Sequence, residues 1–143
     1  MPKLYINTDG GARGNPGPAA IGVVFCDEQG NELHKYHETI GVATNNQAEY
    51  KAIIKALELV LKSKWHRSSN QSAEIICRLD SQLVVEQING NYKVKNGDIK
   101  VFISRITGLL TELARPVTFI HITREQNKMA DKLVNKALDE DLK

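Results

Sequence analysis

Cysteine is scarce in this chain of 143 residues, which contains only Cys26 and Cys77. Neither belongs to a CxxC pair, so the sequence offers no zinc-binding pattern. Both lie in apolar, strand-like runs, where a small buried thiol is the favoured interpretation. Long hydrophobic runs are missing too: no segment approaches the length needed to cross a membrane, and the N-terminus has no signal-peptide pattern. We therefore expect a cytoplasmic protein without a membrane partner.

A strong excess of one charge is also absent. The chain has 19 Lys and Arg residues against 17 Asp and Glu residues, which gives a net charge of +2. So small a charge permits binding to nucleic acid but does not by itself indicate it. Repeats, low-complexity segments and linkers are missing as well. Residues 1–143 are therefore expected to form a single domain, long enough for a real hydrophobic core, that acts as a monomer.

Hydrophobic periodicity predicts a chain that alternates between strands and helices. Strands are expected over residues 3–9, 20–26, 32–40, 74–80 and 117–122. Helices are expected over residues 44–64, 81–89, 99–113 and 125–138. Two overlapping capping boxes, Thr44 with Gln47 and Asn46 with Glu49, mark the start of the first helix.

The lengths of the connections predict how these strands pair. Short connections favour an antiparallel meander of the first three strands, and helical crossovers make strands one, four and five parallel. The order 3-2-1-4-5 satisfies both requirements and places the first strand in the centre, with helices on both faces. In this order Cys26 and Cys77 lie two strands apart, about 10 Å at the ~4.8 Å strand spacing, which excludes a disulfide. The predicted fold class is α/β, with a five-stranded mixed sheet.

Four carboxylates are positioned to converge at one edge of this sheet. Asp9 and Asp80 end parallel neighbouring strands, and the carboxyl ends of such strands are where open α/β sheets bind ligands. Glu49 shares a helical row with the apolar Ile53, which turns it inward. Asp131 lies in the early turns of the last helix, shortly after the last strand.

Three of these acids also have an ordinary structural interpretation. The two aspartates can cap turns, and Glu49 can be the reciprocal half of a capping box. Clustered carboxylates, however, repel one another and raise their pKa values unless cations neutralise them. Oxygen ligands without histidine or cysteine favour Mg²⁺ or Mn²⁺, and two such ions ~3.5–4 Å apart suit in-line displacement at phosphorus.

Four short motifs carry these acids and follow one another along nearly the whole chain. They are Asp9-Gly10-Gly11 with Gly14-Asn15-Pro16-Gly17-Pro18, Thr44-Asn45-Asn46-Gln47-Ala48-Glu49, Asp80-Ser81-Gln82 and Asn127-Lys128-Met129-Ala130-Asp131. Together they resemble ribonuclease H. The resemblance implies a ribonuclease H-like fold and cleavage of the RNA strand of RNA–DNA hybrids by a two-metal-ion mechanism, leaving 3′-hydroxyl and 5′-phosphate ends. It assigns metal binding and catalysis, with two Mg²⁺ or Mn²⁺ ions, to Asp9, Glu49, Asp80 and Asp131.

The resemblance also implies contacts to the substrate. Asn15, Asn45 and Gln82 match positions that touch the minor groove and the RNA 2′-hydroxyl groups, which distinguish RNA from DNA. Thr44 matches a position that binds a DNA phosphate, and a helix N-terminus favours anions. Without the resemblance, these residues are a turn former, a helix cap and exposed amides.

Two departures from the family pattern matter. Where many members carry a basic, tryptophan-bearing protrusion, this chain has only residues 91–97, so it resembles the compact form of the type 1 family. The glycine-histidine loop before the last acid is also absent. Counting back from Asp131 without gaps places His121 at the histidine position, but its flanks predict a continuing strand. Arg124, in the predicted loop, is the second candidate to assist catalysis, through a phosphate contact or product release.

The sequence leaves other functions open. A broader nuclease of the same fold would also cut double-stranded RNA, and a hybrid-binding module would not cut at all. The presence of all four acids argues against the non-cutting module. A globular domain that is merely lined by carboxylates ranks last.

Overall fold

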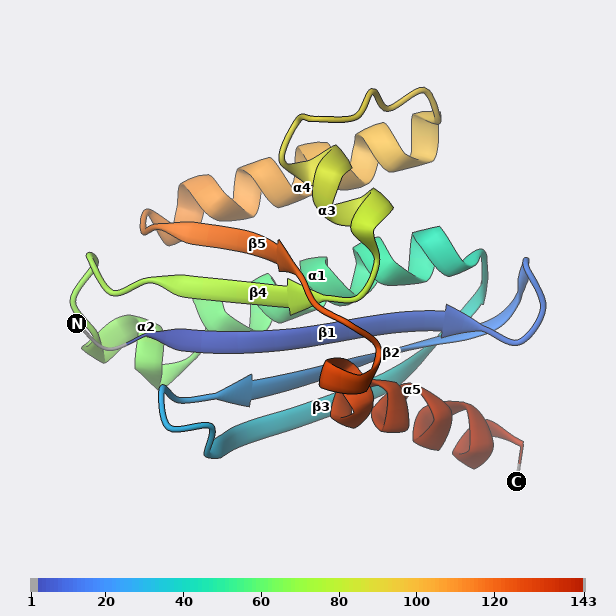
Figure 1. The fold of residues 1–143 in the computed structure, drawn as a ribbon, viewed down its shortest axis with the longest axis horizontal. Coiled ribbons are helices and arrows are strands. Elements are labelled where there is room, and N and C mark those ends of the chain that lie inside the picture. The colour runs from blue at the N-terminus through green and yellow to red at the C-terminus, as the bar shows by residue number, and fades with distance from the viewer. Residues whose placement is uncertain (1–2, 143) are drawn as a thin grey trace.

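The sheet has five strands in the order β3-β2-β1-β4-β5, as predicted from the sequence (Figure 1). This computed structural model describes residues 3–142; residues 1, 2 and 143, at the ends of the predicted domain, lie outside the described range. The strands are β1 (Leu4–Ala12), β2 (Gly17–Cys26), β3 (Glu32–Ala43), β4 (Ile75–Leu79) and β5 (Val117–His121). β2 pairs antiparallel with β1 and β3, and β4 pairs in parallel with β1 and β5, as the connection lengths required.

β1 extends beyond the predicted strand. The expected strand end at Asp9 is wrong, because the antiparallel ladder with β2 continues through Ala12. Pairing with β4, by contrast, stops at Asn7, which lies opposite Arg78. The last part of β1 therefore has one edge paired with β2 and one edge that no strand covers.

The helices largely follow the predicted segments. They are α1 (Asn45–Leu61), α2 (Lys64–Ser68), α3 (Gln82–Ile88), α4 (Gly97–Leu113) and α5 (Lys128–Asp141), with a 3-10 turn η1 (Glu125–Asn127) before α5. Thr44 caps α1 and forms its capping box with Gln47, so Glu49 is not needed for capping. The short α2, capped by Ser63, was not predicted, because its sequence is polar and has no apolar period. The turn η1 makes α5 begin later than expected.

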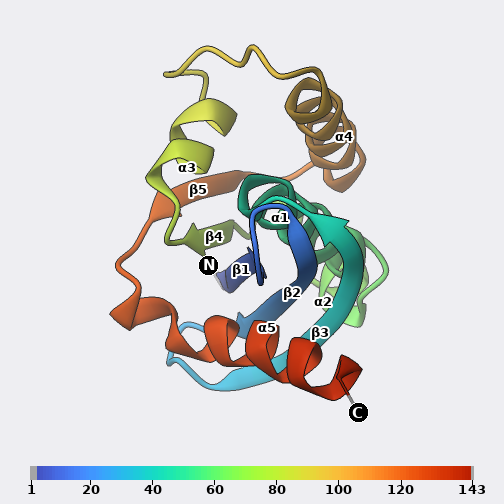
Figure 2. The ribbon, with the colours of Figure 1, turned by 90° about the vertical axis from the view of Figure 1, so that its right-hand side faces the viewer.

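Helices cover both faces of the sheet, as Figure 2 shows. The larger hydrophobic core lies on the face of α1, α3 and α4 and includes Ile6 of β1 and Val84 of α3. α5 packs across β2 and β3 on the other face, where Val24 contacts Leu133. Val23 and Val24, neighbours in β2, therefore belong to opposite cores, as the two-residue period of a strand requires.

The two cysteines are free thiols on strands that β1 separates. Cys26 ends β2 and Cys77 lies within β4, which agrees with the predicted separation. Burial raises the pKa of the Cys77 thiol to about 12, so this side chain behaves as a small buried hydrophobe. Of the helices within residues 3–142, none has both the length and the apolar character needed to span a bilayer.

Candidate active site

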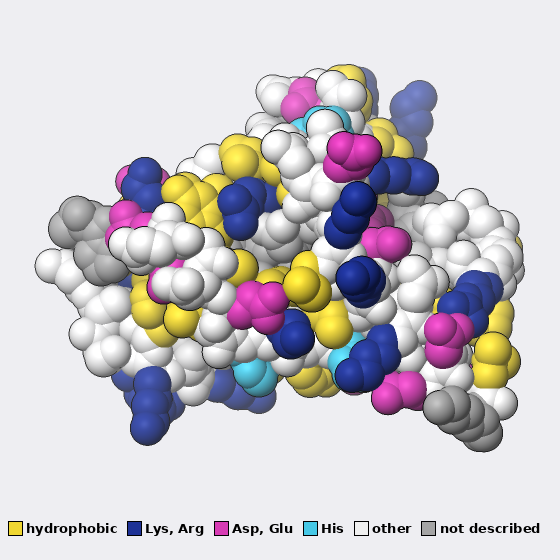
Figure 3. Space-filling view, turned by 60° about the horizontal axis from the view of Figure 1, so that its bottom comes forward, with side chains coloured by type: hydrophobic (Ala, Val, Ile, Leu, Met, Phe, Trp, Pro, Cys, Tyr) yellow, Lys and Arg dark blue, Asp and Glu magenta, His cyan; other side chains and the backbone are white. Residues whose placement is uncertain are grey.

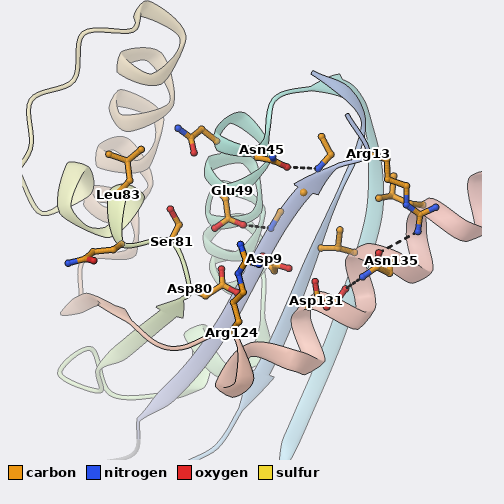
Figure 4. Close-up of a pocket in the computed structure, with 17 residues that line it drawn as sticks. Asp9, Arg13, Asn45, Glu49, Asp80, Ser81, Leu83, Arg124, Asp131 and Asn135 are labelled. Carbon is orange, nitrogen blue, oxygen red and sulfur yellow. Dashed lines mark hydrogen bonds between the residues drawn. The ribbon is translucent and has the colours of Figure 1, made fainter. Parts of the chain in front are cut away.

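The site is built along the free edge of β1. The N–H of Gly10 donates to Oε1 of Glu49 over 2.6 Å, and the N–H of Ala12 donates to Oδ1 of Asn45 over 2.9 Å (Figure 4). Residues four apart on a helix lie one above the other, so the first turns of α1 present both acceptors to this edge. The two side chains take the place of the strand partner that β4 provides only as far as Asn7.

Three carboxylates meet here. Asp9 comes from β1, Glu49 from α1 and Asp80 from the residue that follows β4, and one oxygen from each lies within 4.8 Å of the others. Asp9 and Glu49 are buried, with 8% and 6% of their surface exposed, while Asp80 is half-buried. The predicted convergence of these three acids is confirmed as geometry, although Asp9 lies inside its strand instead of at its end.

Asp131 faces the same cavity from the other side. It lies in the first turn of α5, is exposed, and lines the cavity together with the three clustered acids (Figure 4). Among the described residues, the closely spaced set contains only Asp9, Glu49 and Asp80. The fourth acid therefore lines the same cavity as the cluster but lies outside the closely spaced set.

Burial and mutual repulsion hold protons on this cluster. Burial, followed by the charges of Asp80 and Asp131, raises the pKa of Asp9 to about 7. Burial and the Asp9 charge raise the pKa of Glu49 well above its usual range. Near neutral pH the cluster thus retains protons that free carboxyl groups would have lost, and a bound cation would displace them.

Glu49 has one buried carboxylate oxygen that can accept a proton or a cation. Its Oε1 accepts the Gly10 N–H, but its Oε2 is buried and has no hydrogen-bond partner among the described residues. A proton or a metal ion would satisfy that oxygen. Because all the candidate ligands are carboxylate oxygens, the donor set fits a hard divalent cation such as Mg²⁺ or Mn²⁺.

A cavity of about 680 Å³ surrounds the acids and collects several other predicted residues. Asn45, Gln82 and Arg124 line it, and the Arg124 side chain extends toward Asp80 (Figure 4). His121, the last residue of β5, does not line the cavity, and its exposed ring makes no hydrogen bond to any residue that the structure describes. Thr44 lies just outside the cavity as the cap of α1.

The two predicted asparagines lie with their carbonyl oxygens turned toward the protein. Oδ1 of Asn15 accepts the N–H of Asn45 over 3.0 Å, and Oδ1 of Asn45 accepts the N–H of Ala12. Both side chains are exposed, so their Nδ2 groups remain as donors toward solvent. The two asparagines can therefore donate to acceptor atoms of a ligand while they keep the hydrogen bonds that hold their own side chains in place.

Asn127 belongs to a motif noted in the sequence, but its structural role was not predicted. Its side chain is fully buried, and Nδ2 donates to the carbonyl oxygen of Thr8 over 2.9 Å. This bond fastens the start of α5 to β1, one residue before Asp9. The two residues lie 119 positions apart, so no local sequence pattern marks the contact.

Comparison with known proteins was decisive for the family. Residues 7–137 match the family model described as reverse transcriptase-like. The chain is 47% identical to LC11-RNase H1, isolated from compost by a metagenomic approach, with all of both chains covered and a TM-score of 0.90. It is 38% identical to RNase H1 of Halobacterium salinarum, covering 96% of this chain and 98% of the other, with a TM-score of 0.87. The chain belongs to the ribonuclease H1 family.

LC11-RNase H1 has also been solved in complex with an RNA/DNA hybrid, and that chain is 46% identical to this one at a TM-score of 0.91, over 99% of this chain and 100% of that one. Among curated relatives, the bifunctional protein Rv2228c of Mycobacterium tuberculosis is 37% identical over 138 residues. That match covers 96% of this chain but only 36% of the relative, so the chain spans about a third of that protein.

This ribonuclease H1 family member has the compact form predicted from its sequence. α3 ends at Ile88 and α4 begins at Gly97, so a short connection that carries the exposed Lys93 and Lys95 stands in the region of the absent protrusion. Figure 3 shows Lys and Arg side chains interspersed with Asp and Glu over the face that carries α5. On that face, basic side chains are therefore mixed with acidic ones and not gathered into one basic patch.

Proposed function

We propose that this protein is a metal-dependent endoribonuclease that hydrolyses the RNA strand of RNA–DNA hybrids and leaves 3′-hydroxyl and 5′-phosphate ends. The observation that carries the proposal is the cluster of Asp9, Glu49 and Asp80, with its unpartnered buried oxygen, at the free edge of β1. Full-length similarity to LC11-RNase H1 supports the same activity.

The cluster and Asp131 would together hold two Mg²⁺ or Mn²⁺ ions. When bound, the ions would supply Lewis acidity at the scissile phosphate and neutralise the charge that develops there. The protein supplies rigid placement: Asp9 is fixed in the sheet, and Glu49 is fixed by the Gly10 N–H. Asp131, which lines the cavity from α5, would complete the site.

Polar side chains around the cavity would identify the hybrid. The free Nδ2 groups of Asn15 and Asn45 can donate to 2′-hydroxyl oxygens and to base acceptors in the minor groove. Gln82, exposed at the start of α3, also lines the cavity and would approach the same groove. Thr44, at the N-terminus of α1, would bind a phosphate of the DNA strand.

Arg124 and His121 remain the two candidates for assisting turnover. Arg124 lines the cavity next to the acids, carries a planar guanidinium group suited to phosphate oxygens, and would contact a phosphate or help release the product. His121 lies at the end of β5, outside the cavity lining, which favours Arg124 for this role.

One cleavage assay tests the proposal. Labelled RNA–DNA hybrid, double-stranded RNA and double-stranded DNA are each incubated with Mg²⁺, with Mn²⁺ and with EDTA. We expect cleavage of the RNA in the hybrid with either metal and none in EDTA. Equal cleavage of duplex DNA, or undiminished cleavage in EDTA, would overturn the proposal. Cleavage of double-stranded RNA at a similar rate would favour the broader nuclease, and binding without cleavage would favour the hybrid-binding module.

We also expect a monomer that works in the cytoplasm. Cys26 and Cys77 are free thiols on separate strands, so the fold does not depend on a disulfide that would form in an oxidising compartment. Gel filtration or light scattering of the purified chain, at the concentrations used for the assay, tests the oligomeric state.

A further inference from the structure

Arg78 makes a side-chain contact at the last residue pair where β1 and β4 are hydrogen-bonded neighbours. That pair is Asn7 and Arg78, and Nε of Arg78 donates to Oδ1 of Asn7 over 2.7 Å. Side chains two residues apart in a strand share a face, so Asn7 points to the same side as Asp9, and Arg78 to the same side as Asp80. The contact therefore lies one step, ~6.6 Å along the strands, before the two aspartates.

The guanidinium group of Arg78 is held in place from a second side. It lies over the ring of Tyr5, with 4.6 Å between the guanidinium carbon and the ring centroid. Tyr5 precedes Asn7 by two residues, so β1 alone supplies both the stacking surface and the hydrogen-bond acceptor. A planar group that is both stacked and hydrogen-bonded has little freedom to rotate.

Asn7 links Arg78 to the segment that carries Arg124. With Oδ1 occupied by Arg78, Nδ2 of Asn7 is directed to the carbonyl oxygen of Gln126, at 3.4 Å. The carbonyl that it contacts is two residues beyond Arg124, in the connection between β5 and α5. One amide side chain thus joins β1, β4 and the segment of residues 122–127.

We propose that Arg78 is a positioning residue for this active site. By its hydrogen bond to Asn7, Arg78 links β1 to β4 at their last paired residues and so sets the position of Asp80 relative to Asp9. Through the contact of Asn7 with Gln126, it also holds residues 122–127 so that Arg124 faces the acids. This role rests on the proposed function, because it acts on residues assigned to hybrid cleavage.

The alternative, direct contact of Arg78 with substrate, fits the cavity less well. Arg124 lines the cavity, whereas Arg78 is not among the described residues that line it. Arg78 is half-buried, and its Nε is already engaged by Asn7. Its position supports the cavity without forming part of the surface that a hybrid would touch.

The test compares three variants. Arg78→Met keeps the length of the side chain but removes every donor. Arg78→Lys keeps the positive charge but loses the planar group that stacks on Tyr5 and meets Asn7. Arg105→Met is the matched control, since Arg105 is an exposed arginine on α4 that pairs with Glu58 over 3.0 Å and is not among the described residues that line the cavity.

Two readouts separate structure from activity. Amide hydrogen exchange of residues 122–127, measured without metal or substrate, reports whether the segment has loosened. Steady-state cleavage of the hybrid reports kcat and KM separately. For Arg78→Met we expect faster exchange in residues 122–127 and a kcat reduced by on the order of 10-fold with KM changed less than ~2-fold, since small misplacement in an active site is costly. Arg78→Lys should behave like Arg78→Met, and Arg105→Met like the parent.

The same substitution in the Arg124→Ala protein tests whether Arg78 acts through Arg124. If Arg78 acts through the Arg124 segment, then Arg78→Met should reduce kcat by a smaller factor in the Arg124→Ala protein than in the parent. The same factor in both proteins would show that Arg78 does not act through Arg124.

Normal exchange and normal kcat in Arg78→Met would overturn the proposal. A rise confined to KM that Arg78→Lys restores would also overturn it, because that result marks a direct contact with a phosphate. If the parent does not cut hybrids, the proposed function fails, and the exchange data still decide whether Arg78 orders residues 122–127.

Discussion

Gly10 and Glu49 are joined by a 2.6 Å hydrogen bond from the backbone N–H of Gly10 to the Glu49 carboxylate, across 39 positions of the sequence. The approach is so close that a Cβ on Gly10 would lie 2.2 Å from the carbonyl atoms of Ala48. The absence of a side chain at Gly10 is therefore what lets α1 come within hydrogen-bond distance of β1. The same contact places one acid of the cluster against the strand that carries another.

Gly10→Ala should push α1 away from β1. We expect the free energy of unfolding to fall by at least ~1–3 kcal/mol, the usual cost of overpacking, and cleavage to be lost with it. Urea denaturation measures the first effect and the hybrid assay the second. Gly108→Ala is the control: nothing lies within 4 Å of a Cβ at this exposed position of α4, so this variant should gain ~0.5–1 kcal/mol. Equal stability of the two variants would contradict the argument.

Asp80→Asn should separate activity from folding. The amide keeps the shape of the side chain but removes a charge that raises the pKa of Asp9. Because loss of an outer-shell residue costs metal sites 10–100-fold, loss of Asp80, which we propose as a direct metal ligand, should reduce kcat by at least ~100-fold. Removal of a repelling charge should leave the melting temperature in EDTA equal to or above that of the parent. An unfolded variant, or one with near-normal turnover, would mark Asp80 as structural.

Stability without metal should fall as the pH rises from 5 to 8. The pKa of Asp9 is about 7 in the folded protein, above its ordinary value of 3.8, so folding favours the protonated form. The contribution of Asp9 to stability is complete below its pKa in the unfolded protein and is lost as the pH rises through its pKa in the folded protein. The size of this contribution is ~1.4 kcal/mol for each unit by which the two pKa values differ. Urea unfolding in EDTA across this range measures the effect, and Asp9→Asn should flatten the curve. A parent curve that is flat or rises over the range would contradict the pKa assignment.

Arg124→Ala should reduce turnover more than His121→Ala. Arg124 lines the cavity beside the acids, while His121 ends β5 outside that lining. A histidine that moved protons would leave an inflection near its ordinary pKa, ~6.5, in the pH–rate profile. We therefore expect His121→Ala to keep the profile of the parent. Loss of turnover in His121→Ala with a neutral Arg124→Ala would show that the ungapped alignment to the histidine position is correct.

Local patterns in the sequence were enough for the five strands, for every α-helix except α2, and for their order along the chain. The capping box of Thr44 and Gln47, the alternation along β1 and the helical row that turns Glu49 inward each depend on residues a few positions apart. Connection lengths then led to the sheet order, because short loops and helical crossovers each permit one kind of pairing. The four acids could be assigned to one edge of the sheet for the same reason.

Only the tertiary structure decided how those elements meet. β1 continues past Asp9 because its partner β2 continues, while its pairing with β4 ends at Asn7 and Arg78. Neither limit is visible from the residues of β1. The backbone N–H groups of β1 that have no strand partner beyond Asn7 need other acceptors. Glu49, 39 positions from Gly10 in the sequence, supplies one of these acceptors. Burial follows from the same packing, and burial raises the pKa values of Asp9 and Glu49. Residue types and local periods are properties of the sequence, whereas proton affinity and the spacing of the acids depend on which distant groups exclude water from them.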